Sequence, residues 1–394
     1  MTYDELQKKY IQVCNENMRL RAENQDLRKQ LGILDSPKEF NVTDSAINKH
    51  SSVDEKIDLY MSLFIGRNDV YAKRWYSLQS EKSGYQPACN NEWSEVCNKQ
   101  KYKCSNCPNR KLLPLDNKAI FNHLSGKDKY GRDVIGIYPM LKDETCHFLA
   151  VDFDDEDFEQ ASLAFKNTCI KNNIPAYIER SRSGSGAHIW IFFSEPIEAA
   201  VARKLGSSLL TLAMENQSKI KFTSYDRLFP NQDTMPKGGF GNLIALPLQG
   251  LARKNNNSEF VDDNFVAYPD QWAFLSNIQR ISSLNVTSAI NRICPHNELG
   301  SLVKDNEEKT KPWETKEEYP LSFLDFSGDV KIIKANMLYI EKQNLSHKAI
   351  NKIRRLSAFK NPEFYKAQAM RLPIYNKPRI ISAVEETDEY LGIP

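Results

Sequence analysis

Residues 146–154 read Cys-His-Phe-Leu-Ala-Val-Asp-Phe-Asp, an apolar run that ends in two aspartates, Asp152 and Asp154. Its β-branched and aromatic residues predict a buried strand. Residues i and i+2 of a strand point to the same face, so the two carboxylates lie side by side. Like charges this close are unfavourable unless a cation lies between them, and hard oxygen ligands suit Mg²⁺ or Mn²⁺. The pattern favours a two-metal site for phosphoryl or nucleotidyl transfer, the alternative being an acidic helix N-terminus at 154–157.

A polar loop, Ser183-Gly-Ser-Gly-Ala-His188, connects the next two predicted strands. Its glycines let backbone N–H groups approach an anion, and its serine hydroxyls and His188 can reach phosphate oxygens. Arg182 lies just upstream and can add a charge-assisted contact. An ordinary hairpin loop is the alternative. The nucleotide-binding interpretation is favoured because the loop follows the acidic pair by one strand–helix–strand unit. Ser183, Ser185 and His188 are therefore candidate nucleotide-binding residues.

A third acid, Asp226, is flanked by apolar residues and is followed directly by Arg227. Further on, Lys237 opens a glycine-rich turn that leads into a predicted strand, and such a turn permits close approach of the backbone to a nucleotide. Arg253 lies just past that strand and can contact phosphate. Asp226 is therefore a candidate metal ligand, and the three basic residues are candidate nucleotide or template contacts.

Four cysteines, Cys89, Cys97, Cys104 and Cys107, follow the spacing C-x7-C-x6-C-x2-C. The terminal C-x2-C is a usual zinc-knuckle spacing, and four thiolates make a closed structural Zn²⁺ site. Four unrelated buried cysteines are the alternative. Lysines, arginines and aromatic residues surround the cluster, so the module either contacts a template backbone or is a purely structural staple with a solvated rim.

The first 35 residues carry a heptad repeat over 3–34, with leucine or valine at d and with Asn17 and Asn24 at a. Asparagine at a favours in-register parallel dimers, so we expect a homodimeric coiled coil. The alternative is a single amphipathic helix that packs on its own domain.

Strand and helix patterns alternate along the rest of the chain and indicate an α+β or α/β catalytic core. The predicted strands are Val134–Met140, His147–Phe153, Ala176–Arg180, His188–Phe193 and Asn242–Leu248. The predicted helices are Asp54–Phe64, Asp116–Leu124, Phe158–Asn172, Glu198–Met214, Val330–Lys342 and Ser346–Phe359. The resulting division is a coiled coil (1–35), a linker (36–52), a zinc-knuckle module (53–118), a catalytic core (119–285), a second linker (286–318) and a helical C-terminal region (319–394).

Composition sets the remaining limits. The 394 residues are 41% hydrophobic and 26% charged, which is ordinary for a soluble globular protein. We find no apolar stretch near the roughly 20 residues that a membrane span needs and no signal peptide, so a cytoplasmic protein is expected. Because the net charge is only +2, nucleic-acid binding must depend on local basic patches.

Taken together, these motifs resemble the archaeo-eukaryotic primases, and most closely the primase domain of TOTE conflict systems. The order is Asp-x-Asp, Ser-Gly-x-Gly-x-His, then an Asp and a Gly-Gly turn into an Ala-x-Pro strand. The longest similar stretches are 178–184, 224–233 and 238–247, together with Gly84–Cys89 and the other three cysteines. The resemblance covers roughly residues 60–280.

This resemblance implies a primase-polymerase with an RRM-like catalytic sheet and a second α/β unit. It places Asp152, Asp154 and Asp226 at the metal-ligand positions, and the serine loop with His188 at the triphosphate. Some relatives carry a lysine where this chain has Ser185, so Arg182 or Lys237 is expected to supply that charge. The implied partners are single-stranded DNA template and primer, with dNTPs or NTPs as substrates.

Residues 358–381 resemble the junction that leads into a superfamily 2 helicase in these systems, but we find no Gly-Lys-Ser/Thr phosphate loop in the chain. We therefore expect any helicase elsewhere in the same protein or in a neighbouring chain. Three rival interpretations remain: a metal-dependent nuclease, a zinc-stapled nucleic-acid-binding module, and a coiled-coil scaffold whose enzyme domain has decayed.

Overall fold

A computed structural model of the chain describes residues 46–293 and 321–394, apart from 100, 103 and 375. Its central sheet has five strands in the order β7-β4-β6-β5-β9, and each neighbouring pair is antiparallel. The strands are β4 (Thr145–Phe153), β5 (Tyr177–Arg180), β6 (Ala187–Glu198), β7 (Leu228–Phe229) and β9 (Glu259–Val261). Helix α4 (Phe158–Lys171) connects β4 to β5, and α5 (Ala199–Asn216) connects β6 to β7. The β4-α4-β5-β6-α5-β7 run is therefore a split βαβ unit, in agreement with the predicted α+β class.

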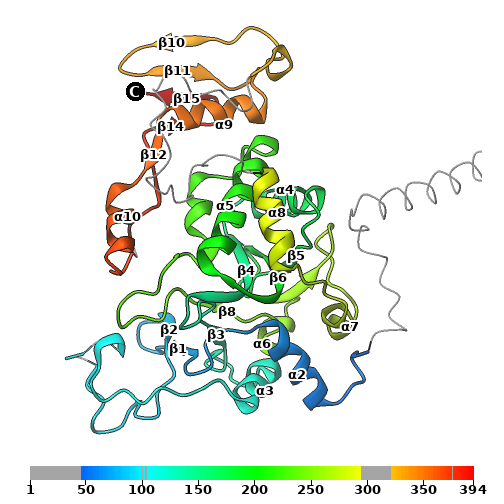
Figure 1. Ribbon diagram of the computed structural model, residues 1–394, viewed down its shortest axis with the longest axis vertical. Coiled ribbons are helices and arrows are strands. Elements are labelled where there is room, and N and C mark those ends of the chain that lie inside the picture. Colours follow the sequence, from blue (N-terminus) through cyan, green and yellow to red (C-terminus); the bar gives the residue numbers. More distant parts are fainter. Residues whose placement is uncertain (1–45, 100, 103, 294–320, 375) are drawn as a thin grey trace, which may run out of the picture. The chain divides into compact units, whose positions relative to one another are not determined.

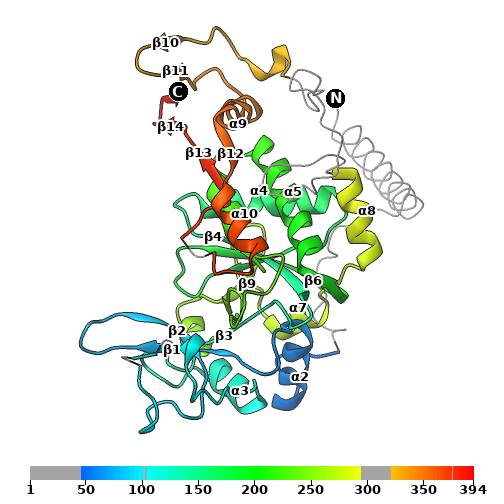
Figure 2. The same cartoon turned by 60° about the vertical axis from the view of Figure 1, so that its left-hand side comes forward.

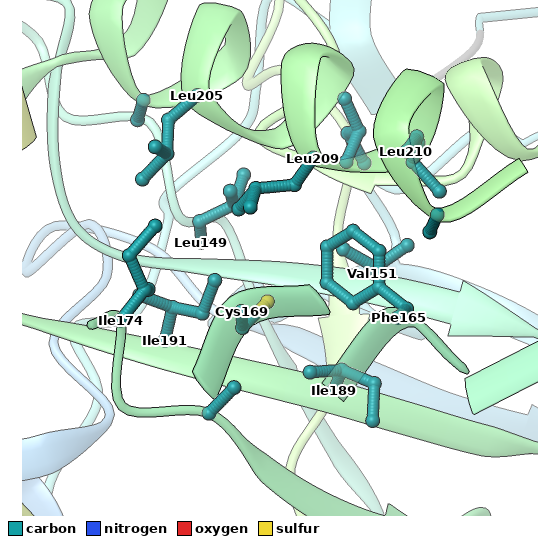
Figure 3. Packing of buried hydrophobic residues seen from close by; sticks show 14 of the residues in the cluster. Leu149, Val151, Phe165, Cys169, Ile174, Ile189, Ile191, Leu205, Leu209 and Leu210 are labelled. Atoms are coloured by element: carbon teal, nitrogen blue, oxygen red, sulfur yellow. The ribbon is translucent and has the colours of Figure 1, made fainter. Parts of the chain in front are cut away.

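Alternating residues of β4 and β6 separate two apolar layers. Leu149, Val151, Ile189 and Ile191 are buried in the main hydrophobic core with side chains of α4 and α5 (Figure 3). The residues between them face the other side, where the rings of Phe148 and Phe192 lie within aromatic contact distance of Trp190. Both faces are covered, which explains why these strands read as continuous apolar runs.

The second aromatic layer is closed by the segment that follows α2 (Val53–Leu63). A capping box formed by Ser52 and Glu55 begins this helix. At its end, the Phe64 ring meets the Trp190 ring edge-on, with centroids 5.1 Å apart. Helix α7 (Gln271–Ser276) contributes Phe274, which packs against Tyr177 and Phe260. Residues far apart in sequence thus cover one face of the central sheet.

A second, four-stranded sheet has the order β2-β1-β3-β8. Its strands are β1 (Ala72–Tyr76), β2 (Ser83–Pro87), β3 (Ile135–Ile137) and β8 (Ile244–Ala245). The predicted boundary between 118 and 119 falls inside this sheet, and Ala46–Pro394 group as one unit by their contacts. The two segments predicted as a zinc-knuckle module and a catalytic core are therefore not separated there, because β1 pairs with β3 across the boundary.

Helix α3 (Asn117–Ser125) begins at the Asp116 cap and ends at Gly126, whose φ is +59°. A Cβ at Gly126 would lie 2.0 Å from the backbone nitrogen of Leu251, so only glycine allows α3 to meet α6 (Gly250–Arg253). The described residues also form the short 3₁₀ helices η2 (Cys104–Asn106), η3 (Phe222–Asp226) and η4 (Phe323–Asp325).

The predicted start of the second linker at residue 286 is wrong. Helix α8 (Ser283–Ile293) continues through it, and Val286, Ala289, Ile290 and Ile293 are buried in the main core. In Figure 1, α4, α5 and α8 gather beside one another above β4 and β6. The 3.6-residue spacing of these apolar side chains indicates a helix and outweighs the polar residues between them.

The C-terminal region is also not simply helical. The predicted helix Val330–Lys342 is wrong, because these residues form the hairpin β10 (Ile332–Lys334) and β11 (Leu338–Glu341). Strand β11 pairs with β15 (Tyr390–Ile393), which also pairs with β14 (Glu385–Glu386). Local periodicity cannot reveal a partner strand some 50 residues away along the chain. Once that strand pairs with β11, the β-branched isoleucines fit a strand.

The rest of the region is mixed. Helix α9 (His347–Leu356) is shorter than predicted and gives way to strand β12 (Ala358–Lys360). Figure 2 shows β12, β13 (Ile380–Ser382) and α10 (Pro362–Ala369) in orange and red. The predicted coiled coil (1–35) and most of both linkers lie outside the described residues, so those predictions stand as they were. No helix in the described part of the chain is long and apolar enough to cross a membrane.

The packing of β4 gives a stability prediction. Leu149→Ala removes a fully buried side chain between β4 and α5, and we expect the free energy of unfolding to fall by about 3 kcal/mol. Leu284→Ala is the matched control, because Leu284 on α8 is 80% exposed and should change it by no more than about 0.5 kcal/mol. Urea denaturation measures both, and equal losses would contradict this description of the core.

Candidate active site

The strand register places three polar side chains in one row across the sheet. Asp152 of β4 is paired with His188 of β6, and His188 is paired with Glu179 of β5. The row continues on the other side, where the Asp152 N–H donates to the Arg227 carbonyl at 3.0 Å. Directly opposed residues in antiparallel strands share a face, so these side chains lie next to one another on the aromatic side of the sheet.

Arg227 bridges the acidic pair. Its Nη1 lies 3.2 Å from Asp152 Oδ2 and 2.5 Å from Asp154 Oδ2. Partial burial opposes the charge of Arg227, but hydrogen bonds and charges from Asp154 and Asp152 raise its pKa overall. A cation thus lies between the two carboxylates, as their mutual repulsion requires. In this protein the cation is a guanidinium, a contact that the sequence had not indicated.

His188 has an acidic neighbour at each of its two ring nitrogens. Its Nδ1 is 2.8 Å from Glu179 Oε2, and its Nε2 is 3.6 Å from Asp152 Oδ1. Burial is the largest influence on His188 and lowers its pKa, but Glu179, Asp152 and Asp154 outweigh it and raise the pKa to about 8. The imidazole is therefore a second cationic group beside the acidic pair at neutral pH.

The serine–glycine loop packs against the end of β4. The hydroxyls of Ser181, Ser183 and Ser185 form a chain, with oxygens 3.0 and 3.1 Å apart. A Cβ at Gly186 would lie 2.8 Å from the Phe153 carbonyl oxygen, so this close approach requires glycine. The predicted proximity of the loop and the acidic pair is thus present in the structure.

Among the described residues, Asp226 makes no hydrogen bond or ion pair with the acidic pair, and the three acids do not form a ready metal site. Its Oδ1 accepts a hydrogen bond from the Arg379 backbone N–H at 2.9 Å. Burial raises the pKa of Asp226, although the Arg379 hydrogen bond and nearby arginines act in the opposite direction. A small cavity of about 20 Å³ is lined by Asp152, Asp154 and Arg227, and Asp226 does not line it. The role of Asp226 as a third ligand stays a prediction.

The remaining candidate basic residues occupy different places. The charge of Arg182 lies near Tyr85 on β2, where it opposes the larger effect of burial, which raises the pKa of the Tyr85 hydroxyl. Lys237 has an exposed side chain, and its backbone N–H donates to the Arg371 carbonyl. Arg253 pairs with Glu259 on β9, with Nε 2.9 Å from Oε1. None of these contacts reaches the acidic pair.

The four cysteines line one cavity of about 30 Å³. Cys89 Sγ accepts the Lys111 N–H at 3.3 Å. Desolvation raises the pKa of Cys104; the neighbouring thiols add to this effect, and Lys99 opposes it. Among the described side chains, no three His, Cys, Asp or Glu residues already have the geometry of a metal site. The sequence thus predicted the grouping of the thiols, while their use as ligands stays a prediction.

The segment 53–118, which carries the four thiols and is called the cysteine module below, also contacts the glycine-rich turn. The Arg110 guanidinium lies 5.6 Å from the centroid of the Phe240 ring, and that of Arg67 lies 5.2 Å from it. Two residues on, Asn242 donates from Nδ2 to the Leu228 carbonyl of β7 at 2.9 Å. The turn is thereby tied both to the cysteine module and to the strand that follows Asp226.

Sequence reasoning gave no role to Glu179. It is 1% exposed and accepts hydrogen bonds from His188 and from Trp190 Nε1. A carboxylate directly after the apolar residues 176–178 of a predicted strand was the available signal. The strand register that puts it beside His188 was not.

Paired carboxylates, a histidine and a serine–glycine loop on a split βαβ sheet suit the class of proteins that transfer phosphoryl or nucleotidyl groups. A family model, described as the TOTE conflict system archaeo-eukaryotic primase domain, matches residues 55–289, which is more than half of the chain. The chain therefore belongs to this family, and the predicted resemblance is confirmed.

Among solved structures, the chain is similar to the polymerase domain of Mycobacterium tuberculosis ligase D in complex with DNA. The sequence identity is 11%, the similarity covers 64% of this chain and 90% of that chain, and the TM-score is 0.29. No curated protein sequence matches the chain significantly.

The pKa of His188 predicts a pH-dependent stability. Because this pKa rises from 6.5 to about 8 on folding, protonated His188 stabilises the metal-free fold fully below pH 6.5. That contribution, on the order of 2 kcal/mol, is lost as the pH rises through 8. Unfolding free energies of the wild type and His188→Gln, measured at pH 6 and pH 9, should differ by more at pH 6. Parallel pH profiles would contradict the assigned contacts.

Proposed function

We propose that this protein is a primase-polymerase that makes or extends primers on a single-stranded DNA template, with dNTPs or NTPs as substrates. The observation that supports it best is the position of Asp152 and Asp154, side by side around a cation and next to His188 and the serine loop. Paired acids beside a loop that can cradle polyphosphate suit in-line nucleotidyl transfer.

The donor chemistry of the acidic pair fits Mg²⁺ or Mn²⁺, because aspartate oxygens are hard ligands. Arg227 already occupies the position of a positive charge between the carboxylates. Asp152 and Asp154 would hold the metal ions, with Asp226 as a proposed third ligand. When bound, the ions activate the attacking hydroxyl and neutralise the departing pyrophosphate.

The chain's own groups bind and orient the nucleotide in this proposal. His188 Nε2 and the hydroxyls of Ser183 and Ser185 hold the triphosphate, so that the reacting atoms stay in line. Arg227 would be available to bind phosphate if metal ions took its place between the two aspartates. Arg182 and Lys237 are proposed to add charge, and Arg253 to contact the template.

A metal-dependent nuclease remains the second candidate, because similar acids can activate water. The two activities separate in one assay. A labelled template–primer lengthens if nucleotides are added and shortens if the strand is cut. A homodimer through residues 3–34 and a superfamily 2 helicase partner also remain proposals.

Neutralising the pair tests the proposed site. Asp152→Asn with Asp154→Asn should lower primer extension with Mn²⁺ by at least about 100-fold, because charge stabilisation of the transition state is lost. Asp143→Asn is the matched control: Asp143 precedes the other end of β4, where it accepts from Thr145, and it should leave extension unchanged. Extension that survives the double substitution would refute the assignment.

We further propose that Cys89, Cys97, Cys104 and Cys107 hold a structural Zn²⁺. Four thiols around one small cavity form the donor set that structural zinc sites use. Bound zinc would fix the segment that carries Arg110, and through the contact with Phe240 it would steady the glycine-rich turn.

Metal analysis of the purified protein should find about one zinc per chain. Cys104→Ser with Cys107→Ser should remove the zinc and lower the thermal midpoint, because metal binding contributes folding free energy. Cys169→Ala is the control, since Cys169 is buried in the main core and should leave the zinc content intact. Zinc that persists in the double serine variant would contradict this proposal.

A further inference from the structure

Glu179 is a buried carboxylate that the proposed chemistry does not use. It lies on β5, an inner strand of the central sheet, and its Oε2 is 2.8 Å from His188 Nδ1 and 2.9 Å from Trp190 Nε1, accepting a hydrogen bond from each. Removing a carboxylate from water is costly, and an apolar residue could pack at such a position without that cost. The charge is therefore unusual for a residue with a purely structural role.

The contacts around Glu179 form a rigid support. Trp190 is fully buried, with its ring stacked on Phe192 and met edge-on by Phe64. Because the indole cannot move without disturbing this layer, its N–H fixes the Glu179 carboxylate. The carboxylate in turn fixes the Nδ1 side of His188.

We propose that Glu179 is a positioning residue that holds His188 by Nδ1, so that Nε2 is presented to the nucleotide polyphosphate beside Asp152. The two ring nitrogens lie on opposite sides of the imidazole, and Nε2 is 3.6 Å from Asp152 Oδ1. An imidazole that turned freely would lose this orientation for part of the time. This inference rests on the proposed function, because it assumes a nucleotide at the acidic pair.

A simpler role for Glu179 would be to satisfy the Trp190 N–H alone. The two roles differ in their dependence on His188. A positioning residue acts through His188, so its removal should have no further effect once His188 is gone. If Glu179 only supports Trp190, its removal should weaken nucleotide binding by the same factor whether His188 is present or absent.

The test is a double-mutant cycle with Glu179→Ala, His188→Ala and the double variant, read out by binding of a fluorescent dATP analogue in Mn²⁺. We expect Glu179→Ala to weaken binding about tenfold, the lower end of the loss known for groups that orient metal-ligating histidines. The double variant should bind no more weakly than His188→Ala. Equal losses in both backgrounds would overturn the proposal.

Two further variants separate orientation from folding. Glu179→Gln keeps an oxygen acceptor for both N–H groups and should retain most of the affinity. Asp270→Asn changes another buried acid, which caps α7, and should bind the nucleotide like the wild type. If Glu179→Gln binds as weakly as Glu179→Ala while both keep the wild-type thermal midpoint, orientation by hydrogen bonding is refuted.

A direct readout distinguishes failure of this inference from failure of the proposed function. In ¹⁵N-labelled protein, the His188 Nδ1–H resonance should be protected from exchange in the wild type and in Glu179→Gln, and lost in Glu179→Ala. If this resonance is unaffected by Glu179→Ala while the wild type extends primers, only the positioning role is wrong. If the resonance behaves as expected but the wild type neither binds nucleotide nor extends primers, the proposed function fails, and the positioning role for a nucleotide fails with it.

Discussion

Repulsion between the Asp152 and Asp154 carboxylates is the constraint around which the site is built. The apolar residues of β4 are buried on both faces of the sheet, so the strand cannot turn to move the two charges apart. Two cationic groups offset the repulsion: Arg227 lies between the carboxylates, and Nε2 of His188 faces Asp152. Folding meets the cost of holding the two acids together, and in the proposed function metal ions would take the place of Arg227.

The sequence allowed much of this sheet to be predicted, because its signals are local. The apolar runs of β4 and β6, the bounds of α2, α3, α4 and α5 to within two residues, and the approach of the serine loop follow from short-range patterns. The partners of Arg227 and Glu179 do not, since both depend on which strands pair. The strands after residue 330 escaped prediction for the same reason: β11 finds its partner β15 only at the end of the chain.

Two other parts of the chain reach the neighbourhood of the site. The cysteine module touches the glycine-rich turn through Arg110 and Phe240. In the C-terminal region, Arg379 donates its backbone N–H to Asp226, and its buried guanidinium lies over the Phe364 ring. Gln368 donates to Asp233, which also pairs with buried Arg203. The segment that follows Asp226 is thus held by contacts from distant sequence, which is why local patterns place this acid less well than the pair.

Anomalous diffraction from crystals grown with Mn²⁺ and a non-hydrolysable dNTP tests the central claim most directly. The account predicts manganese peaks against the carboxylates of Asp152 and Asp154, Arg227 turned toward phosphate, and the triphosphate directed at His188 and the serine loop. Manganese bound elsewhere, with Arg227 still between the two aspartates and the nucleotide absent from this face of the sheet, would contradict it.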